Sequence, residues 1–522
     1  MTPVTLALLH ETGGVAWAVF AVCILALVPA GARWLRVAQR EHYIPDATSR
    51  FAIRWWTSDP FNVALVAVAL AGVVLSGVWP LAAIATIAVA VFAPLHLSIR
   101  GRTSPLVLTR RLRSLAVVWL AAQAALIGVG VGVGAPVPFA AVGLVAAPVL
   151  VDAALFVTAP IERRLSQRFV DMAAARLRRV GATIVAITGS YGKTSTKNHV
   201  AHLVTGTKAV VATPASFNNR VGLARAVNEH LAEGTEVFVA EMGTYGPGEI
   251  RDLCRWCPPQ ISVMTAIGPV HLERFGSEDA ILAAKSEINE RASVVVVNSD
   301  DPRLAALGAA LDAAAGGPEV VRAAAEDSDA DVRVEVDDGK VSVVVDGTIA
   351  GEPVPLPPGI QPTNLACAIA VALQLDVSLG EVLERVPTLA AVANRLTADT
   401  SASGVHVIDD TFNSNPAGAR AALALLAAAP STGERVVVTP GMVELGRRQA
   451  AENEAFAAAA CEVASTLVVV GLTNRRALLR GAAGHGRVVV VRTRDEAVAW
   501  VRTNLGPGEV VLYENDLPDH YP

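Results

Sequence analysis

Residues 184–196 have the residue types and spacing of a phosphate-binding loop: Ile-Val-Ala-Ile-Thr-Gly-Ser-Tyr-Gly-Lys-Thr-Ser-Thr. The apolar, largely β-branched residues 184–187 predict a short buried strand. Gly189 and Gly192 then flank a tight turn that leads into an expected helix. Glycines let backbone N–H groups approach a phosphate closely, and a helix N-terminus adds partial positive charge. This stretch is therefore predicted to bind the phosphates of a nucleotide.

The residues after the second glycine would supply charge and a metal ligand. Lys193 is expected to neutralise the β- and γ-phosphates of ATP, and the Thr194 hydroxyl to bind Mg²⁺. The loop has the short form G-x-x-G-K-T, since Ile187 stands where the longer pattern has glycine. A chance glycine-rich turn is the alternative, and the strand, lysine and hydroxyl together argue against it. The residues expected to bind the nucleotide here are Gly189, Ser190, Gly192, Lys193, Thr194 and Ser195.

Three more residues could take part in chemistry behind this loop. Glu241 follows the apolar run 237–240, and a carboxylate at the carboxyl end of a strand near such a loop is placed to hold Mg²⁺. His271 comes just after another expected strand, and Lys285 lies on an expected helix. Taken singly, they could be a capping carboxylate, a hydrogen-bonded histidine and a solvated lysine. Their order behind one phosphate loop favours a shared site.

Composition separates the chain into two parts. The 522 residues are 52% hydrophobic with mean hydropathy +0.45, and the apolar excess lies in about the first 160 residues. The net charge of −5 says little about partners, and no nucleic-acid partner is expected. Five cysteines argue against a disulfide framework. Cys254 and Cys257 could be half a zinc site or a redox pair, but two half-buried cysteines near a helix end are favoured because a zinc ribbon needs four ligands.

Five apolar runs in succession predict a membrane domain over residues 1–160. Each run is near the ~20 residues needed to cross a bilayer, and a buried core helix explains any single run but not all of them. The runs are 13–32, 61–79, 80–98, 114–134 and 136–158.

Arginine clusters follow the first, third and fifth runs, within 33–54, 100–113 and 163–179, whereas the other connections are uncharged. With five spans every cluster falls on the cytoplasmic side. The N-terminus is then outside, and the phosphate loop lies on the side where ATP is. We therefore expect a multi-pass protein of the cell (inner) membrane with cytoplasmic catalytic domains. Residues 161–181 predict a basic linker helix, which either lies along acidic headgroups or simply connects.

The remainder predicts two α/β domains, over 182–393 and 394–522. Short β-rich runs alternate with helical stretches in both, which indicates parallel sheets. A hairpin is expected over 332–346, with its turn at 337–339. A helix is expected over 363–374, and 307–330 is interpreted as a variable surface region. The expected fold class is an α-helical membrane domain plus α/β, with a central P-loop ATPase domain and a Rossmann-like C-terminal domain.

Several ordered motifs resemble the Mur ligase family. They are Thr188–Ser195, Glu241-Met-Gly, His271-Leu-Glu, Ala284-Lys-Ser-Glu-Ile, Asn364-Leu-Ala-Cys-Ala-Ile-Ala, Asn394-Arg-Leu, Ile408–Pro416 and Gly441–Gly446. The resemblance covers 182 to about 515. It implies an ATP-dependent, ADP-forming amide ligase, in which a substrate carboxylate attacks the γ-phosphorus and an amine displaces phosphate from the acyl phosphate. The implied cofactors are ATP and Mg²⁺.

The resemblance also implies roles for matching residues. Lys193 and Thr194 would bind ATP phosphates and the first Mg²⁺, while Glu241 and His271 would hold metal. Lys285 matches a lysine that several members carbamylate, which makes it a metal-directed carboxylate. The implied catalytic residues are thus Lys193, His271 and Lys285. Nucleotide contacts would come from Asn364 (adenine), Arg395 (γ-phosphate) and Asp409, and the closed site would be shaped by Asn413 and Asn415.

Three departures leave the substrate open. Apolar runs stand where members usually have a soluble domain that grips UDP, and Ser216 replaces an expected asparagine. Residues 513–519 read Tyr-Glu-Asn-Asp-Leu-Pro-Asp instead of a basic Lys-Gly-Ser-Arg-like ending. The expected partners are a small-molecule or lipid-linked carboxylate and an amine donor, in an envelope (peptidoglycan-type) precursor. The alternatives are a poly-amino-acid or other non-murein amide ligase, a P-loop membrane ATPase, or a degenerate nucleotide-binding scaffold.

Overall fold

The computed structural model describes residues 3–95, 97–99, 105–214, 217–390, 397–411, 414–484, 487–518 and 520–522. It divides into two compact units. The helical unit contains the chain up to Leu165 together with Gly471–Arg475 and Leu517–Pro522. The ligase unit contains Ser166–Val470 and Arg476–Asp516.

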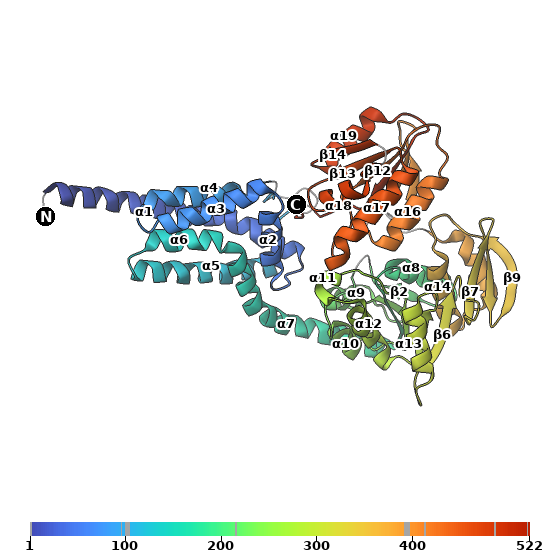
Figure 1. Ribbon diagram of the computed structural model, residues 1–522. Helices are drawn as coiled ribbons and strands as arrows, with labels where there is room; N and C mark the ends of the chain where they lie inside the picture. The colour runs from blue at the N-terminus through green and yellow to red at the C-terminus, as the bar shows by residue number, and fades with distance from the viewer. Residues whose placement is uncertain are drawn as a thin grey trace. The chain divides into compact units, whose positions relative to one another are not determined.

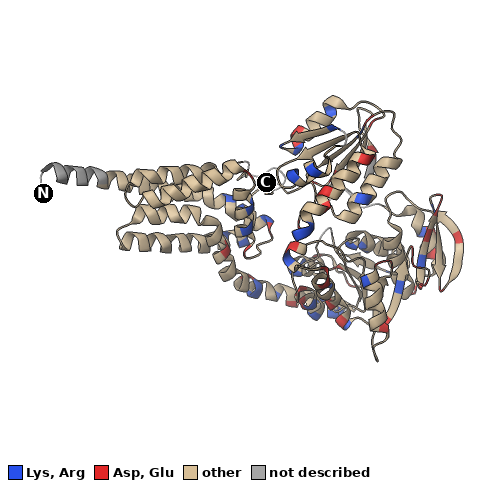
Figure 2. Ribbon diagram, viewed as in Figure 1, with Lys and Arg blue, Asp and Glu red and all other residues tan. Residues whose placement is uncertain are grey.

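The helical unit packs its helices around a large apolar core, with a smaller apolar cluster between α3 and α4 (Figure 1). Figure 2 shows that α3 to α6 are almost without charged residues, which gather where these helices meet α2. The helices are α1 (Pro3–Arg40), α2 (Ala47–Thr57), α3 (Pro60–Leu75), a 3₁₀ turn (Pro80–Ala82), α4 (Ala83–Phe92), α5 (Arg110–Gly132), α6 (Pro136–Val145) and the first part of α7 (Ala147–Val180).

The prediction of five spans is not confirmed. By length and composition, two of the described helices could each cross a membrane, namely Gly13–Arg40 and α5. The number rises to four if α2 with α3 and α6 with α7, bent by 112° and 74°, each count as one span. Among the described residues of the run 80–98, the helical ones belong to the 3₁₀ turn and the ten-residue α4. At 1.5 Å per residue, α4 rises about 15 Å, half of a hydrocarbon core of about 30 Å.

Arg33, which belongs to the first predicted arginine cluster, caps the end of α4. Its guanidinium is buried and donates hydrogen bonds to the carbonyls of Ala90 (2.9 Å), Val91 (2.7 Å), Ala93 (2.9 Å) and Leu97 (3.1 Å). The last carbonyls of a helix have no partner within it. Arg33, which lies on α1, therefore provides hydrogen-bond donors for the carbonyl groups at the end of α4.

Helix α7 runs without interruption through the boundary predicted between 160 and 161. Within the ligase unit, its residues Val170, Ala173 and Leu177 are buried in the core beside the central sheet. Ile161 and Met172, two apolar residues of the same helix, are instead 49% and 63% exposed. The choice between a headgroup-lying helix and a linker thus stays a prediction, as does the division of the chain at 160, 181 and 393.

The central sheet of the ligase unit has the order β2-β3-β1-β4-β5-β6-β7-β8-β9. It is parallel from β2 to β7 and continues as the antiparallel pairs β7–β8 and β8–β9. The strands are β1 (Thr183–Thr188), β2 (Val210–Ala212), β3 (Val237–Glu241), β4 (Ile261–Met264), β5 (Val294–Asn298), β6 (Glu319–Ala324), β7 (Val332–Asp337), β8 (Lys340–Val345) and β9 (Thr348–Pro355).

Helices cover both faces of this sheet, which is why β1 and β3 are apolar throughout (Figure 1). One face packs on α8 and α14, and the other on α7, α9 and α10. The helices are α8 (Lys193–Val204), α9 (Arg220–His230), α10 (Glu249–Trp256), α11 (Leu272–Phe275), α12 (Glu278–Ser286), α13 (Pro302–Asp312), α14 (Pro362–Gln374) and α15 (Leu379–Arg385).

The second sheet has the order β10-β11-β15-β12-β13-β14, and only β10 pairs antiparallel. Its strands are β10 (Thr397–Thr400), β11 (His406–Asp410), β12 (Arg435–Thr439), β13 (Thr466–Val470), β14 (Arg487–Val491) and β15 (Val510–Glu514). Its helices are α16 (Pro416–Ala428), α17 (Gln449–Val463), α18 (Arg475–Gly481) and α19 (Arg494–Asn504).

The hairpin over 332–346 is confirmed as β7–β8, and the helix over 363–374 as α14. The interpretation of 307–330 as a variable surface region is wrong, because this segment contains β6, an internal strand between β5 and β7.

Candidate active site

The phosphate loop lies between the end of β1 and the start of α8. Gly192 has φ = +79° and directly precedes α8. This left-handed backbone favours glycine, and a Cβ atom here would lie 2.2 Å from Asn364 Oδ1, so any other residue would also displace the Asn364 side chain. Ser190 fixes the other side of the turn, because its N–H donates to the Ala266 carbonyl at 2.7 Å and its hydroxyl donates to the Gly268 carbonyl at 3.1 Å.

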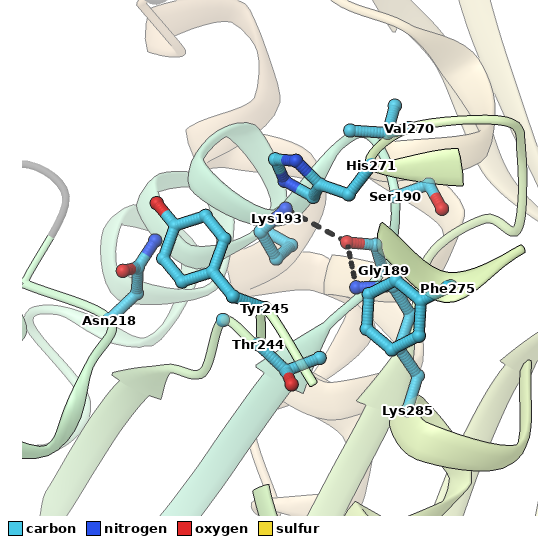
Figure 3. A pocket seen from close by; sticks show the side chains of 11 residues that line it. Gly189, Ser190, Lys193, Asn218, Thr244, Tyr245, Val270, His271, Phe275 and Lys285 are labelled. Atoms are coloured by element: carbon cyan, nitrogen blue, oxygen red, sulfur yellow. Dashed lines mark hydrogen bonds between the residues drawn. The ribbon is translucent and has the colours of Figure 1, made fainter. Parts of the chain in front are cut away.

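Two lysines converge on one backbone oxygen of this loop (Figure 3). Lys193 Nζ and Lys285 Nζ donate to the Gly189 carbonyl at 2.8 and 3.0 Å. Lys285 is buried, and this burial, together with the charge of Lys193, holds the pKa of Lys285 well below its usual range. A lysine in this state loses its proton readily, and the neutral amine is a nucleophile.

Glu241 is the last residue of β3, and three polar side chains contact its carboxylate. Thr194 Oγ1 donates to its Oε2 at 2.9 Å, Asn218 Nδ2 donates to its Oε1 at 3.2 Å, and Lys197 Nζ lies 3.5 Å from Oε2. Glu241 and Lys197 are each only 2% exposed. The predicted pair of Thr194 and Glu241 is therefore brought together. Two residues of this cluster were not predicted from the sequence. Lys197 lies one helical turn after Lys193, and Asn218 lies two positions after Ser216, where the sequence departs from the family pattern.

His271 is held by a residue far along the chain. Its Nδ1 contacts a carboxylate oxygen of Glu444, which lies in the loop after β12. The Glu444 carbonyl also accepts from the Glu273 N–H at 3.2 Å. The Tyr245 ring meets the His271 ring edge to face, with centroids 5.2 Å apart. Glu444 had been recognised only as part of a motif, without a role.

These groups surround one cavity (Figure 3). It is lined by Gly189, Ser190, Lys193, Asn218, Gly243, Thr244, Tyr245, Val270, His271, Phe275 and Lys285. Five predicted site residues line it, and two of them, Lys193 and Lys285, bring their amines to the same point. Thr194 and Glu241 adjoin the phosphate loop without lining the cavity.

Other predicted residues lie elsewhere. Asp409 accepts hydrogen bonds from the N–H and hydroxyl of Thr411 at 3.0 and 2.6 Å, and it does not line the cavity. Asn415 caps α16, accepting from the backbone N–H groups of Ala417 and Gly418. The residues predicted at this site that lie outside the described part of the chain are Ser216, Arg395 and Asn413.

A metal ion would need ligands beyond the side chains. Within the described ranges, no three His, Cys, Asp or Glu residues gather closely enough to hold one. The Thr194 hydroxyl and the Glu241 carboxylate are hard oxygen donors 2.9 Å apart. They fit Mg²⁺, which usually keeps waters and takes phosphate oxygens beside one or two carboxylates.

The Cys-x-x-Cys pair is fully buried rather than half-buried. Cys254 and Cys257 are 1% and 0% exposed, and both are free thiols. Burial raises the pKa of the Cys254 thiol to about 12. A thiolate is the form that binds metal or reacts, so these cysteines behave as core residues at the end of α10.

The unusual acidic ending places Glu514 inside the second sheet. Its side chain is 0% exposed and accepts hydrogen bonds from the Ser414 and Thr439 hydroxyls. Burial raises the pKa of Glu514 to about 7, against the lowering effect of these hydroxyls. The following Asn515 donates from Nδ2 to the Gly441 carbonyl at 2.7 Å.

Comparison with known proteins agrees with this site. Residues 187–372 match the Mur ligase middle domain, and residues 394–513 match the Mur ligase glutamate ligase domain. A UDP-N-acetylmuramoyl-tripeptide–D-alanyl-D-alanine ligase of Mycobacterium tuberculosis is 36% identical over 372 residues, which cover 65% of this chain and 71% of that protein. This chain belongs to the Mur ligase family. The resemblance in the motifs is thereby confirmed, and the chain is an ATP-dependent ligase.

Solved structures share the fold of this Mur ligase. MurF from Acinetobacter baumannii is 24% identical with a TM-score of 0.58, over 67% of this chain and 77% of that one. MurF from Thermotoga maritima, solved with ADP, is 24% identical with a TM-score of 0.56, over 67% and 80%. Neither matched family domain includes the residues before Ile187.

Proposed function

We propose that this chain is an ADP-forming amide ligase that acts on a peptidoglycan-type precursor at the inner face of the membrane. The observation that carries the chemistry is the cavity in which Lys193, Lys285 and His271 meet behind the phosphate loop. The substrate class is supported by the names of the relatives, which join D-alanyl-D-alanine to a UDP-linked tripeptide.

In this proposal the loop binds ATP and the residues behind it bind the metal. Lys193 would contact the phosphates, and Asn364, which touches Gly192, would face the adenine. Thr194 and Glu241 would hold Mg²⁺, and His271 and a modified Lys285 would serve a further ion. Bound Mg²⁺ supplies charge neutralisation at the phosphate oxygens. Gly189, Ser190 and Ser195 complete the proposed nucleotide site, with Arg395 and Asp409 from the C-terminal domain.

Lys285 would work as a carbamate. Its neutral amine attacks the carbon of CO₂, the N–C bond forms, and one amine proton leaves to water. The cation becomes an anion, which removes the repulsion between two ammonium groups at Gly189. The buried environment that lowers the pKa of Lys285 favours the neutral amine that this step needs.

The reaction would proceed in two displacements. A carboxylate oxygen of the acceptor attacks the γ-phosphorus, ADP leaves, and an acyl phosphate forms. The amine nitrogen then attacks the acyl carbon, the C–O bond to phosphate breaks, and the amine loses a proton. Lys193 would offset the negative charge that crowds the first step. His271 is fixed by Glu444, so it can hold one orientation throughout.

The apolar helices suggest an acceptor at the bilayer. Holding a site near the membrane raises the effective concentration of a lipid-linked substrate, as a tether does. The gathering of basic residues where the helices meet α2 supports a cytoplasmic orientation of that end (Figure 2). Whether the acceptor carries a lipid or UDP distinguishes two forms of the same proposal.

Metabolite profiling after depletion of the protein tests the substrate class. We expect a lipid-linked or nucleotide-linked peptide precursor to accumulate, and the wild-type gene, but not Lys193→Ala, to reverse it. Unchanged envelope precursors with loss of a separate polymer would instead indicate a ligase outside peptidoglycan synthesis.

A further inference from the structure

The side chain that contacts His271 comes from the other matched domain of the ligase unit. His271 lies between β4 and α11 in the Mur ligase middle domain, and Glu444 follows β12 in the glutamate ligase domain. An ionised carboxylate only accepts hydrogen bonds, so this contact assigns a proton to His271 Nδ1, which donates it to Glu444. Within the described residues, His271 Nε2 has no hydrogen-bond partner. Nε2 is therefore the ring nitrogen whose lone pair is left for a ligand in the cavity that His271 lines (Figure 3).

Both residues of this contact have a backbone conformation that side chains rarely adopt. The angle φ is +59° at His271 and +64° at Glu444. A left-handed backbone is uncommon outside glycine, and it persists where the surrounding structure enforces it, often at functional sites. Here the two residues with this conformation are the two that contact each other. Both loops are therefore shaped for this contact, which distinguishes it from a chance meeting of two surface side chains.

Two amide side chains of the same domain hold the start of the loop that carries Glu444. Asn453, on α17, is 0% exposed. Its Oδ1 accepts from the Met442 N–H at 2.8 Å, and its Nδ2 donates to the Met442 carbonyl at 2.9 Å. Asn515 Nδ2 donates to the Gly441 carbonyl at 2.7 Å. Because its first residues are fixed in this way, the loop presents Glu444 in a defined position.

The same loop also contacts the backbone that follows His271. The Glu273 N–H donates to the Glu444 carbonyl at 3.2 Å. A Cβ atom at Gly446 would lie 3.3 Å from the Glu273 nitrogen, so the two backbones approach each other closely. The loop 441–446 therefore meets the middle domain through its backbone as well as through the Glu444 carboxylate.

We propose that Glu444 is a positioning residue that orients His271 as a metal ligand, so that metal binding at Nε2 and docking of the loop 441–446 stabilise each other. The inference rests on the proposed function, in which His271 holds metal. Metal-bound histidines commonly donate the other ring N–H to a carboxylate, which fixes the ring and makes the free nitrogen a better ligand. Here that carboxylate belongs to the C-terminal domain, so the metal site is complete only when this domain is docked. The coupling is reciprocal, because each of the two events favours the other by the same free energy.

Mn²⁺ bound to the full-length protein with ADP tests the positioning role. Electron spin echo modulation detects nitrogen bound directly to Mn²⁺, and the part of the signal that His271→Ala removes belongs to His271. Glu444→Asn should remove the same part and raise the apparent Kd for Mn²⁺ about 10- to 100-fold. Asparagine tolerates the left-handed backbone at this position and is too short to replace the carboxylate. Asp338→Asn, at an exposed left-handed position of the β7–β8 hairpin (φ = +44°), is the matched control and should change neither quantity.

Hydrogen exchange tests the coupling in the opposite direction. Adding Mn²⁺ to the ADP-bound full-length protein should slow amide exchange of residues 441–446 several-fold in wild type, but not in His271→Ala or Glu444→Asn. Equal exchange with and without Mn²⁺ in wild type would overturn the coupling.

The outcomes separate this inference from the proposed function. If Glu444→Asn keeps the His271 signal and the Mn²⁺ affinity of wild type, the positioning role is wrong while His271 remains a metal ligand. If His271→Ala removes no signal, His271 does not bind the metal, and this inference falls with that role. Neither measurement uses an acceptor or an amine, so the ligase reaction is judged separately, by phosphate release.

Discussion

At the scale of residues, the Gly189 carbonyl is an acceptor shared by two lysines. Two ammonium groups at one oxygen repel each other, and in a buried site this repulsion is poorly screened. Of the two lysines, Lys285 has the lowered pKa, because its side chain is the more deeply buried. The arrangement favours either loss of a proton from Lys285 or its conversion to an anion.

The carbamate proposal predicts a dependence on bicarbonate. Added bicarbonate should raise the turnover of the purified wild-type protein, since CO₂ is then available to the Lys285 amine. Lys285→Ala should have low turnover that bicarbonate does not change, and short carboxylic acids should restore part of it. Steady-state phosphate release measures both effects. A bicarbonate response that survives in Lys285→Ala would place the effect elsewhere.

Glu514 predicts a specific pH dependence of stability. The folded protein keeps its proton up to about pH 7, whereas the ordinary pKa of the group is 4.5. Between these values the folded state binds more protons, so the contribution of Glu514 to the free energy of unfolding falls as pH rises. Its pKa shift corresponds to at most about 3 kcal/mol.

Glu514→Gln removes that titration and keeps one acceptor oxygen; its amide NH₂ can donate to the other of the two hydroxyls of Ser414 and Thr439. The melting temperature of the full-length variant should equal or fall below that of wild type near pH 4.5 and exceed it increasingly toward pH 8. A difference between the two proteins that does not change with pH would show that Glu514 is ionised in the folded state throughout.

The site residues that the sequence predicted are those that sit in contiguous motifs, such as Lys193 in its loop and Lys285 in its helix. Glu444 could not be given a role, because it meets His271 across 173 positions of the chain. Asn218 and Lys197 are likewise defined by their contacts with Glu241 in three dimensions. The departure of residues 513–519 from the family pattern was visible in the sequence, but the burial of the Glu514 side chain was not.

At the scale of elements, most strands of both sheets were predictable because they are runs of Val and Ile buried on both faces. β6 was missed because the segment around it is rich in Ala, Gly and Asp. The apolar runs were found, but run length does not reveal where a helix bends. Pro60 starts α3 after a bend of 112°, and Pro148 lies at the start of α7 after one of 74°.

A buried carboxylate of α7 caps the start of α2. Asp152 accepts hydrogen bonds from the first N–H groups of α2, at Thr48 (3.2 Å) and Ser49 (2.7 Å). Loss of such a cap costs about 0.5–2 kcal/mol. Asp152→Ala should therefore lower the melting temperature of the full-length protein in detergent.

Asp46→Asn is the matched control, because Asp46 precedes α2 but its side chain makes no capping hydrogen bond, and asparagine tolerates the left-handed backbone at this position (φ = +66°). It should change the melting temperature little. If the two variants melt alike, the role of Asp152 in holding the start of α2 is wrong.

At the scale of the whole molecule, no boundary drawn along the sequence could assign Leu517–Pro522 to the helical unit. Composition identifies the apolar N-terminal third of the chain. The assignment of Leu517–Pro522 to the helical unit depends instead on the contacts of Trp55 and Glu41 with His520. The family match, in contrast, was predictable because its motifs lie in order within the ligase unit.

The proposed orientation can be tested without knowing the number of spans. α5 starts with Arg110 and Arg111 and ends at Gly132, and it is long and apolar enough to cross alone. Ala135→Cys should therefore react with an impermeant maleimide from outside intact cells, and Arg163→Cys only after the membrane is opened. Labelling of position 135 only after opening would reverse the orientation.

The central claim, that ATP is consumed to join a carboxylate to an amine, is tested most directly by phosphate release from the purified full-length protein with Mg²⁺ and ATP. The UDP-linked tripeptide or its lipid-linked form serves as acceptor, and D-alanyl-D-alanine as amine. We expect amide product and phosphate in equal amounts only when both are present. Lys193→Ala should reduce the rate about 10²-fold or more, and Lys340→Ala, on the exposed hairpin, should not. Hydrolysis of ATP at the same rate without acceptor or amine would contradict the account.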